Sequence, residues 1–460
     1  MITKIEIDGF KSFRNFSMEF TPFTVVAGIN ASGKSNLFDA LELLSRLATS
    51  SLRDAFPDSR GTVNELFTLI DSENYMNRMT FAVEMLVARK IKDNWGMEDE
   101  IKTPRLRYEL TIERKKNERG FEELSVLHES LLKIQTNDDK WARAFIPRNH
   151  QEIWKSTQKG GTSTPFIETK TINGLPTISI RQDGRQGGKA TPANSINQTV
   201  LGGVNSVDFP HVFAAKEEMR NWRFMQLNPE ELRKPTVQDA KMSDEITHNG
   251  ANLASALYRM KMEDEYILVE ISRQLIKFLP EYISVDVLND EANKQFIIKL
   301  KHKDGKEFSS RVLSEGTLRL LALSIIQYDE RHTGLLCFEE PENGIHPQRI
   351  KLMTELLYNL SADFENKTTP LRQVIINTHS PILVREILNW KNDTNVSIWL
   401  SKMRTLITEM NGKKVKMKNT QMSAVKIDNQ YHISPSISQM SIADLEEYLN
   451  TLKDESEIID

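Results

Sequence analysis

Cysteine is almost absent from this sequence, which has a single one, Cys337, among its 460 residues. An intrachain disulfide is therefore excluded, and the low thiol content favours a reducing compartment such as the cytoplasm. The sequence also lacks an uninterrupted apolar run of about 18 residues, so we expect no membrane-spanning helix. Its first residues, MITKIEIDGFKSF, place charges where a secretory signal needs an apolar run. We expect a cytoplasmic protein with no membrane partner.

An excess of charge of one sign is missing as well. The 60 Lys and Arg residues are balanced by 64 Asp and Glu residues, which gives a formal net charge of -4. No overall basic field marks the chain as a polyanion binder, so a nucleic-acid contact would have to be a local patch. Lysines recur at 299–306 and 413–418, but a solvated face explains either group, and nucleic acid stays open as a partner. No zinc-ligand or HNH-like cluster is present, so we expect no nuclease site in this chain.

The first half of the sequence shows hydrophobic patterns typical of strands. Period-2 alternation or short apolar runs predict strands at residues 2–7, 16–20, 23–27, 80–88, 105–114 and 121–132, the later ones in a mostly antiparallel sheet. Leu37, Leu41 and Leu44 line one side of a helix that follows residues 23–27. Residues 156–206 hold eight of the 20 glycines and few large apolar residues, which favours a long loop or a mobile hairpin.

The second half alternates helices with short strands. Helices are predicted within 252–279 and at 318–326, 349–360 and 441–452, and strands at 282–288, 295–301, 335–338 and 374–377. Asn411-Gly412 is typical of a hairpin turn. We therefore predict an α/β fold with a mixed parallel sheet, an antiparallel β lobe and a helical or loop insertion. We expect four regions: an N-terminal lobe at 1–150, a Gly-rich insertion and connector at 151–235, a helical segment with a C-terminal lobe at 236–400, and a hairpin with a helix at 401–460.

Residues 28–35, GINASGKS, fit the pattern G-x-x-x-x-G-K-[ST] between a predicted strand and an amphipathic helix. The glycines let backbone N–H groups turn toward a phosphate chain, the lysine reaches the terminal phosphates and the serine hydroxyl can ligate Mg²⁺. A chance match is disfavoured because both flanking elements are correct. We expect phosphate contacts from Gly28, Asn30, Ala31, Ser32, Gly33, Lys34, Ser35 and Asn36.

The predicted strand 335–338 ends in carboxylates at Glu339, Glu340 and Glu342. Adjacent carboxylates repel each other, so such a group is tolerated mainly where a metal, water or cations are present. Beside a phosphate loop, we expect Glu339 to hold Mg²⁺ together with Ser35, and Glu340 to activate the attacking water. The alternative is a solvated acidic turn before Pro341.

Two further segments are ambiguous when each is taken alone. Ser314, Glu315 and Gly316 open a predicted helix, where they could bind an anion or could simply cap the helix. His379 follows the predicted strand 374–377, at an edge where α/β sheets bind ligands, although a lone histidine is more often structural.

Taken in order, GINASGKSN, LSEGT, LLCFEEPENGIHP and NTHSP resemble the ABC-type ATPase domain of the RecF, SMC and OLD-nuclease group, especially the small AAA-labelled ATPases of prokaryotic defence modules. FKSF at 10–13 and the segment 221–235 are also similar to that group. The resemblance implies a Walker A loop at 28–35, an ABC signature at 314–316, a Walker B pair at Glu339 and Glu340, a D-loop at 343–346 and a switch histidine at His379.

Two positions depart from the family pattern. Glu339 stands where the family usually has the shorter aspartate, which leaves the metal geometry open. A Q-loop glutamine is not identifiable, because residues 79–84, where one would be expected, contain none. The heptads that would build long coiled-coil arms do not persist over three or four repeats either, so such arms are not expected.

The resemblance implies ATP and Mg²⁺ as cofactors and a homodimer, or a higher even oligomer, in which Ser314 of one copy completes the ATP site of another. It also implies a separate effector, an HNH or Toprim nuclease as in Septu-type and PARIS-type systems, gated in antiphage defence or DNA handling. A non-hydrolysing scaffold or sensor stabilised by ATP remains the alternative. A transporter subunit is disfavoured by the 280 positions from Lys34 to Ser314.

Overall fold

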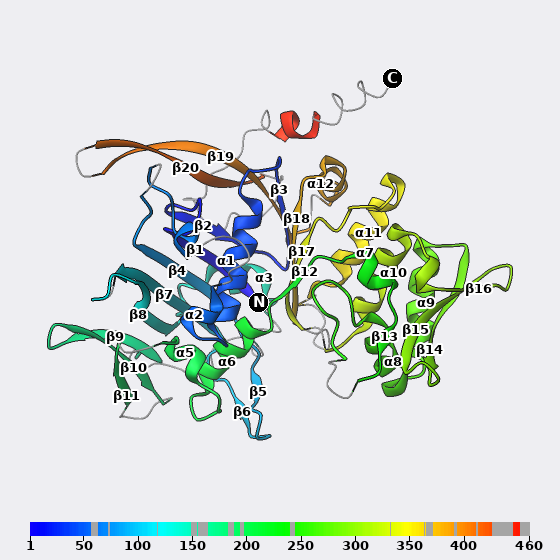
Figure 1. Ribbon diagram of the computed structural model, residues 1–460, viewed down its shortest axis with the longest axis horizontal. Helices are drawn as coiled ribbons and strands as arrows, with labels where there is room; N and C mark the ends of the chain where they lie inside the picture. The colour runs from blue at the N-terminus through cyan, green and yellow to red at the C-terminus, as the bar shows by residue number, and fades with distance from the viewer. Residues whose placement is uncertain are drawn as a thin grey trace.

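A six-stranded sheet runs through the centre of the computed structural model (Figure 1). The structure describes residues 1–56, 63–71, 74–116, 118–148, 154, 164–182, 188–193, 197–239, 244–331, 333–362, 364, 371–390, 393–410, 413–425 and 445–450. The sheet order is β12 (Arg223–Met225), β17 (Gly334–Glu339), β18 (Arg372–Thr378), β3 (Phe23–Ala27), β19 (Val396–Met410) and β20 (Lys413–Ala424). The first five strands are parallel and β20 is antiparallel to β19. The carboxyl ends of β12, β17, β18 and β3 therefore share one edge.

An eight-stranded antiparallel sheet forms the lobe to the left of this sheet in Figure 1. Its order is β11 (Gly188–Pro192), β10 (Leu175–Arg181), β9 (Ile167–Ile172), β8 (Glu122–Lys133), β7 (Arg105–Lys116), β4 (Arg78–Leu86), β1 (Ile2–Asp8) and β2 (Phe16–Glu19). The predicted antiparallel sheet is confirmed. For the Gly-rich segment we expected a long loop or a mobile hairpin, and the long loop is wrong, because β9, β10 and β11 pair antiparallel with one another and extend this sheet. Ile167, Ile178 and Ile180 are buried there, so a few apolar side chains are enough to fix the strands.

Helix α1 (Lys34–Leu47) lies between the two sheets (Figure 1). Its buried face joins one apolar core with Ile5 of β1 on one side and Cys337 of β17 on the other. That double burial explains why Leu37, Leu41 and Leu44 repeat at helical spacing. Shorter helices complete this lobe, namely α2 (Leu52–Ala55), α3 (Lys140–Phe145), α5 (Val200–Gly203) and α6 (Pro210–Arg220), and the hairpin of β5 (Lys90–Lys92) and β6 (Glu98–Glu100) projects from it.

A second lobe, to the right in Figure 1, combines a small sheet with helices. The sheet contains β13 (Thr236–Val237), β14 (Tyr282–Asp290), β15 (Gln295–His302) and β16 (Glu307–Ser309). The helices are α7 (Pro229–Arg233), α8 (Leu253–Glu263), α9 (Ile267–Phe278), α10 (Glu315–Tyr328), α11 (Pro347–Asn359) and α12 (Pro381–Leu388). The predicted alternation of helices and strands is confirmed here, and one apolar core joins this lobe to the outer face of the parallel sheet.

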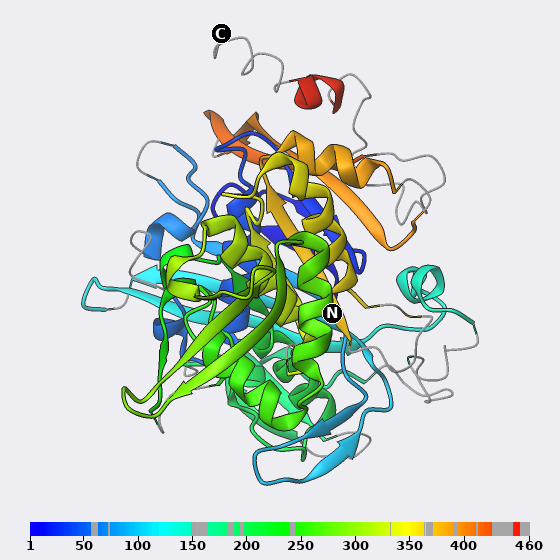
Figure 2. The ribbon, with the colours of Figure 1, turned by 90° about the vertical axis from the view of Figure 1, so that its right-hand side faces the viewer.

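The longest helices within the described ranges, α1 and α10, have 14 residues each, as expected for a chain without coiled-coil arms. None of the helices in the described part is long and apolar enough to cross a membrane. Strands β19 and β20 form the predicted hairpin, although its Asn411-Gly412 turn lies outside the described residues. Of the predicted helix at 441–452, residues 445–450 are described and helical. Figure 2 shows β19 and β20 at the top of the molecule and the β5–β6 hairpin at the bottom.

Candidate functional site

The loop from Gly28 to Gly33 leaves the carboxyl end of β3 and leads into α1. Its backbone enters the left-handed region at Ala31, with φ 60°, and at Gly33, with φ 92°. A Cβ atom on Gly33 would lie 1.9 Å from the Thr420 hydroxyl oxygen of β20, so only glycine fits there. The sharp curl that the motif predicts is therefore present.

Lys34 points back into this loop. Its Nζ donates hydrogen bonds to the carbonyl oxygens of Gly28 at 2.8 Å and Ile29 at 3.0 Å. Burial lowers the pKa of Lys34, while the charges of Glu340, Glu342 and Glu339 act in the opposite direction. The ammonium group thus lies at the loop without a direct ion pair among the described residues, as a group held ready for an anion would.

The hydroxyl of Ser32 is a second unmatched group in the loop. It is buried and finds no hydrogen-bond partner anywhere in the described chain. A buried hydroxyl without a partner costs free energy unless a ligand satisfies it. The residues of the loop therefore fit a phosphate group on two counts, an available cation and an orphaned hydroxyl.

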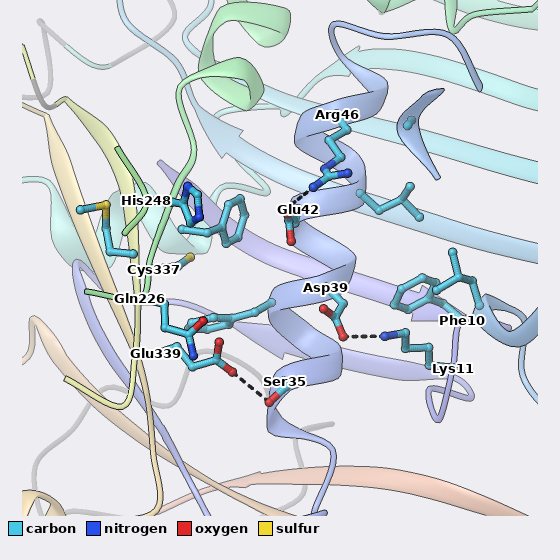
Figure 3. A pocket seen from close by; sticks show the side chains of 16 residues that line it. Phe10, Lys11, Ser35, Asp39, Glu42, Arg46, Gln226, His248, Cys337 and Glu339 are labelled. Carbon is cyan, nitrogen blue, oxygen red and sulfur yellow. Dashed lines mark hydrogen bonds and ion pairs between the residues drawn. The ribbon is translucent and has the colours of Figure 1, made fainter. Parts of the chain in front are cut away.

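Two oxygen-bearing side chains, which were predicted to hold a magnesium ion, meet at the end of β17. The hydroxyl of Ser35 donates to Glu339 Oε1 at 3.2 Å (Figure 3). Asn377 Nδ2 lies 3.5 Å from the same oxygen. The longer side chain of Glu339 therefore brings its carboxylate to the predicted partner. The described residues contain no group of three or more His, Cys, Asp or Glu side chains that could hold a metal by themselves. Because Mg²⁺ in phosphate sites takes few protein ligands and keeps phosphate oxygens and waters, this pair fits it.

Glu340 lies one residue beyond the strand and is held on both sides. Its Oε1 lies 3.0 Å from His379 Nδ1, and its Oε2 accepts a hydrogen bond from Asn343 Nδ2 at 2.8 Å. The backbone of Glu340 is in the left-handed region with φ 46°, which is unusual for glutamate and strained. The sequence-predicted pair Glu340 and His379 is thus in direct contact, at the edge where β17 and β18 end.

The third carboxylate of this segment has a structural partner instead. Glu342 is buried and accepts a hydrogen bond from the Thr378 hydroxyl. Burial raises the pKa of Glu342, against the lowering effect of that hydrogen bond. The acidic cluster at the strand end is therefore divided between two partly exposed carboxylates, Glu339 and Glu340, and one buried carboxylate.

The helix start at residues 314–316 lies in the other lobe. Ser314 caps α10, because its hydroxyl accepts a hydrogen bond from Thr317 N at 3.3 Å, as predicted. Gly316 lies against Gly344, where a Cβ would meet the Gly344 carbonyl oxygen at 2.8 Å. Across the described ranges, no hydrogen bond joins Ser314, Glu315 or Gly316 to residues 28–36 of the same chain. Ser314 and Glu315 are exposed. Lys34, Ser35, Glu339, Glu340 and His379 meet at the sheet edge, whereas no hydrogen bond ties this group to the loop.

Asn36 does not point to the loop interior. Its Nδ2 donates to the Ser12 hydroxyl at 2.7 Å, which in turn lies 2.6 Å from the Thr420 hydroxyl. Ser401 of β19 donates to the Ser32 carbonyl oxygen at 2.8 Å. These contacts, which we call the hairpin brace, tie the loop to β19 and β20. No local pattern predicts the hairpin brace, because the residues that it joins are almost 400 positions apart.

Gln226 is a site residue that the sequence analysis missed. It follows β12, whose Met225 lies beside Phe338 of β17, so Gln226 comes level with Glu339. Figure 3 shows Gln226, Glu339 and Ser35 at one end of a cavity of about 290 Å³. Gln226 also lines a second cavity, of about 460 Å³, together with Glu340. The sequence does contain a signal for this residue, because in the segment NWRFMQ the polar Gln226 comes directly after a short apolar run.

The expectation that a Q-loop glutamine would lie near residues 79–84 is wrong. That segment lies within β4, paired to β1 and β7 in the antiparallel sheet. Its side chains therefore do not reach the carboxyl edge of the parallel sheet.

Comparison with known families finds two matches. Residues 1–170 match a model described as "AAA ATPase domain", and residues 208–385 match one described as "AAA domain, putative AbiEii toxin, Type IV TA system". The first range contains the loop at 28–35, and the second contains Ser314, Glu339, Glu340 and His379. The two matched ranges together therefore include the site residues from both halves of the chain. No curated protein matches the chain.

Heads of SMC proteins are among the solved structures that match the chain. One is the SmcHead bound to the C-winged helix domain of ScpA, with 15% identity over 92% of this chain and 98% of that chain and a TM-score of 0.48. Another is the Smc head domain with an extended coiled coil bound to the C-terminal domain of ScpA from Pyrococcus furiosus, with 12% identity over 98% and 99% and a TM-score of 0.42. A third, the SMC head domain from Thermotoga maritima, has 12% identity over 93% and 99% and a TM-score of 0.36.

Proposed function

We propose that this chain is an ATPase of the ABC type whose ATP sites are each completed by a second copy, and whose opening and closing gates a separate effector protein. The observation that carries the proposal is the alignment, at one sheet edge, of Lys34, Ser35, Glu339, Glu340 and His379. A solvated acidic turn would not need a histidine and an amide on the two oxygens of Glu340.

Binding of ATP would use the loop and the first turn of α1. Lys34 would exchange its contacts with the Gly28 and Ile29 carbonyl oxygens for the terminal phosphates, and the orphaned Ser32 hydroxyl would gain an acceptor. The amino end of α1 contributes the positive end of its dipole. Burial has already removed much of the water from Lys34, so its charge acts in a poorly screened environment.

Hydrolysis would depend on three side chains at the strand ends. A magnesium ion bound by Ser35 and Glu339 would supply charge neutralisation of the phosphates. Glu340 would accept a proton from the attacking water, and His379 and Asn343 would keep its carboxylate oriented for that task. We also propose that Gln226 orients water beside Glu339, which fits its position in both cavities.

Completion by a second copy follows from the separation of the two half-sites. Ser314 and Glu315 are exposed in one lobe and the loop residues Asn30 and Ala31 are exposed at the sheet edge. An exposed helix start with free N–H groups is a binding site for anions. In a symmetric dimer, α10 of each copy would cover the phosphates held by the other, so one nucleotide would bridge two chains. Binding would close the pair and hydrolysis would reopen it.

We propose further that the effector is a nuclease of the HNH or Toprim type, on a separate chain, in antiphage defence or DNA handling. This proposal rests on the family resemblance and on the description of the matched family at residues 208–385, which names a toxin of a Type IV TA system. Direct contact with nucleic acid stays open. A test is co-expression with the product of the neighbouring gene, followed by measurement of DNA cleavage with and without ATP.

The central test compares the wild-type protein with Glu340→Gln and Lys34→Ala. We expect Glu340→Gln to lose ATP hydrolysis by at least about a hundredfold and to form a stable dimer with Mg-ATP, seen by light scattering. Lys34→Ala is expected to lose ATP binding. Retained hydrolysis in both variants would refute the site. An equally negligible rate in the wild type and in Glu340→Gln, with ATP-dependent assembly intact, would favour the alternative of a scaffold or sensor.

A further inference from the structure

Two apolar side chains are exposed to solvent, one in the phosphate loop and one just before the start of α10. Ile29, within the phosphate loop, is 63% exposed, and Val312, two residues before Ser314, is 68% exposed. A single exposed apolar residue is ordinary on a protein surface. These two are unusual in their placement, because neither position needs an apolar side chain for the phosphate chemistry that its neighbours supply.

The backbone fixes the direction in which Ile29 points. The carbonyl oxygen of Ile29 accepts hydrogen bonds from Lys34 Nζ at 3.0 Å and from Ser32 N at 3.3 Å. The preceding residue, Gly28, is buried, and a Cβ there would lie 2.6 Å from the Ser401 carbonyl oxygen. The loop therefore displays Ile29 outward from a rigid base.

Val312 is displayed in the same manner. It ends a short 3-10 helix, Ser310–Val312, whose Ser310 is buried and donates to the Arg233 carbonyl oxygen at 3.1 Å. The following residue, Leu313, is buried in the core of that lobe, and its carbonyl oxygen lies 3.5 Å from a guanidinium nitrogen of Arg233. Two anchored neighbours thus hold Val312 on the surface, and little conformational entropy remains to be lost on contact.

Both side chains are close in sequence to residues that would contact the same phosphate group between two copies. If Ser314 of one copy touches a phosphate cradled by the other, the Cα atom of Val312 lies within about 7 Å of the Ser314 Cα atom that carries this contact. Ile29 belongs to the cradle itself. Its side chain and Val312 of the other copy would then approach each other on the same rim of the nucleotide.

We propose that Ile29 of one copy packs against Val312 of a second copy, and that this apolar contact forms part of the ATP-dependent interface at both nucleotides. The inference rests on the proposed function, in which two copies share each ATP. The occupant of this surface is a second copy because each half-site carries one member of the pair. In a single chain, Ile29 and Val312 are both exposed to water. In a closed pair with twofold symmetry the contact forms twice, once at each nucleotide, so the Ile29 and Val312 side chains of both copies are buried.

The test measures association of Glu340→Gln chains at saturating Mg-ATP by sedimentation velocity, with saturation checked for every variant by titration of a fluorescent ATP analogue. In that background, Ile29→Lys and Val312→Glu should each weaken association by about tenfold or more, because each buries a charge against an apolar partner. Met97→Asp is the matched control. Met97 is 61% exposed on the distant β5–β6 hairpin, and its substitution should leave association unchanged (Figure 2).

The double variant Ile29→Lys/Val312→Glu identifies the contact itself. If the two side chains meet across the interface, the new lysine and glutamate pair, and association should return to within about threefold of the Glu340→Gln protein. Uncharged Ile29→Gln and Val312→Gln should weaken association less than the charged singles, and circular dichroism checks that every variant folds.

The outcomes separate the two proposals. If Glu340→Gln stays monomeric with Mg-ATP, the shared-nucleotide function is refuted, and this contact with it. If Glu340→Gln dimerises and both single variants associate as tightly as Met97→Asp, the function stands and the contact is refuted. A double variant that is weaker than either single variant would also refute the contact, because the two positions would then face different partners.

Discussion

At the scale of single residues, Glu340 combines a strained backbone with a fully engaged side chain. A positive φ for a residue with a Cβ costs about 1–3 kcal/mol, and such conformations persist where the surroundings enforce them. Here the enforcing contacts are the backbone hydrogen bond from Glu340 N to the Asn377 carbonyl oxygen at 2.8 Å and the two side-chain contacts with His379 and Asn343. In this conformation the carboxylate reaches His379, which follows β18, and Asn343.

Removal of the imidazole should therefore affect the chemical step more than binding. We expect His379→Ala to lower kcat for ATP hydrolysis by about 10- to 100-fold, with KM changed less than about threefold, because Glu340 loses its orienting partner. His128→Ala, on the antiparallel sheet, is the control and should leave both constants unchanged. An increase in KM alone, with kcat preserved, would contradict this role.

A second residue-scale prediction concerns stability and pH. Burial raises the pKa of Glu19 to about 7, an effect that Glu84 increases and Lys4 opposes, and its Oε2 has no hydrogen-bond partner within the described ranges. The folded state therefore binds a proton on the Glu19 carboxylate more tightly than the unfolded state does, because the pKa of glutamate in the unfolded chain is near 4.5. Stability is thus lost as pH rises from about 4.5 to about 7, and the loss is complete above that range.

Glu19→Gln should remove this loss. We expect its free energy of unfolding to exceed that of the wild type by about 1–2 kcal/mol at pH 8 and by much less at pH 4.5. Urea denaturation at the two pH values measures the difference. Glu118→Gln, at an exposed position, should show no such dependence. A gain of equal size at both pH values would rule out the titration of Glu19 as its cause.

At the scale of elements, the phosphate loop depends on a hairpin that follows it by almost 400 residues. The hairpin brace fixes the loop from behind, since Ser401 holds the Ser32 carbonyl oxygen and Thr420 occupies the space beside Gly33. Movement of β19 or β20 would therefore change the shape of the phosphate loop. This coupling is mechanical, because the contacts are made by short side chains on two paired strands.

Gly33→Ala tests how tightly the hairpin fits the loop. The new Cβ would clash with Thr420, and alanine would be strained at φ 92°, so the loop should distort and ATP affinity should fall by at least about a hundredfold. Gly305→Ala is a matched control, because Gly305 has φ 85° and open space where its Cβ would be. It should lose about 1 kcal/mol of stability from strain and retain ATP affinity, measured by calorimetry. Equal ATP affinities for the two variants would show that the contact with Thr420 is unimportant.

At the scale of the whole molecule, the two lobes carry complementary halves of one site. In the proposed function, the sheet edge would supply the cation, the magnesium ligands and the base, while the exposed amino end of α10 in the other lobe would bind the phosphates of a second copy. Because residue 316 is a glycine, α10 can lie directly on the backbone at Gly344. Gly344 is only four residues after Glu340. A change at Glu340 could therefore reach the helix start through a short and tightly packed segment.

Ser314→Arg should separate nucleotide binding from assembly. The arginine would obstruct the approach of α10 to a second copy, so we expect single-site ATP binding within about threefold of the wild type and loss of ATP-dependent dimers. Mixing Ser314→Arg with Lys34→Ala should restore part of the hydrolysis, because a mixed pair contains one site with both groups intact. The restoration is measured by comparing the ATPase rate of the mixture with the rate of each variant alone. If the mixture is as inactive as its components, the sites are not shared.

Local patterns in the sequence were sufficient for most of the elements and for much of the site. The phosphate loop, the cap at Ser314, the strand that ends at Glu339 and the strand before His379 each depend on neighbours within a few residues. Backbone geometry, capping and periodic burial are local properties, so a single sequence reports them. The Asn411-Gly412 hairpin followed in the same way from its turn residues and flanking strands.

Contacts between distant segments were decided only by the tertiary structure. Gln226 comes level with Glu339 because β12 pairs with β17, and the hairpin brace exists because β19 pairs with β3. Strands β9, β10 and β11 join the antiparallel sheet although their sequence resembles a loop. Strand pairing depends on which edges remain free once the whole chain has folded, and one sequence does not encode that in any short window. The amino acids alone therefore determined the chemistry available at the strand ends, and the fold decided which side chains meet there.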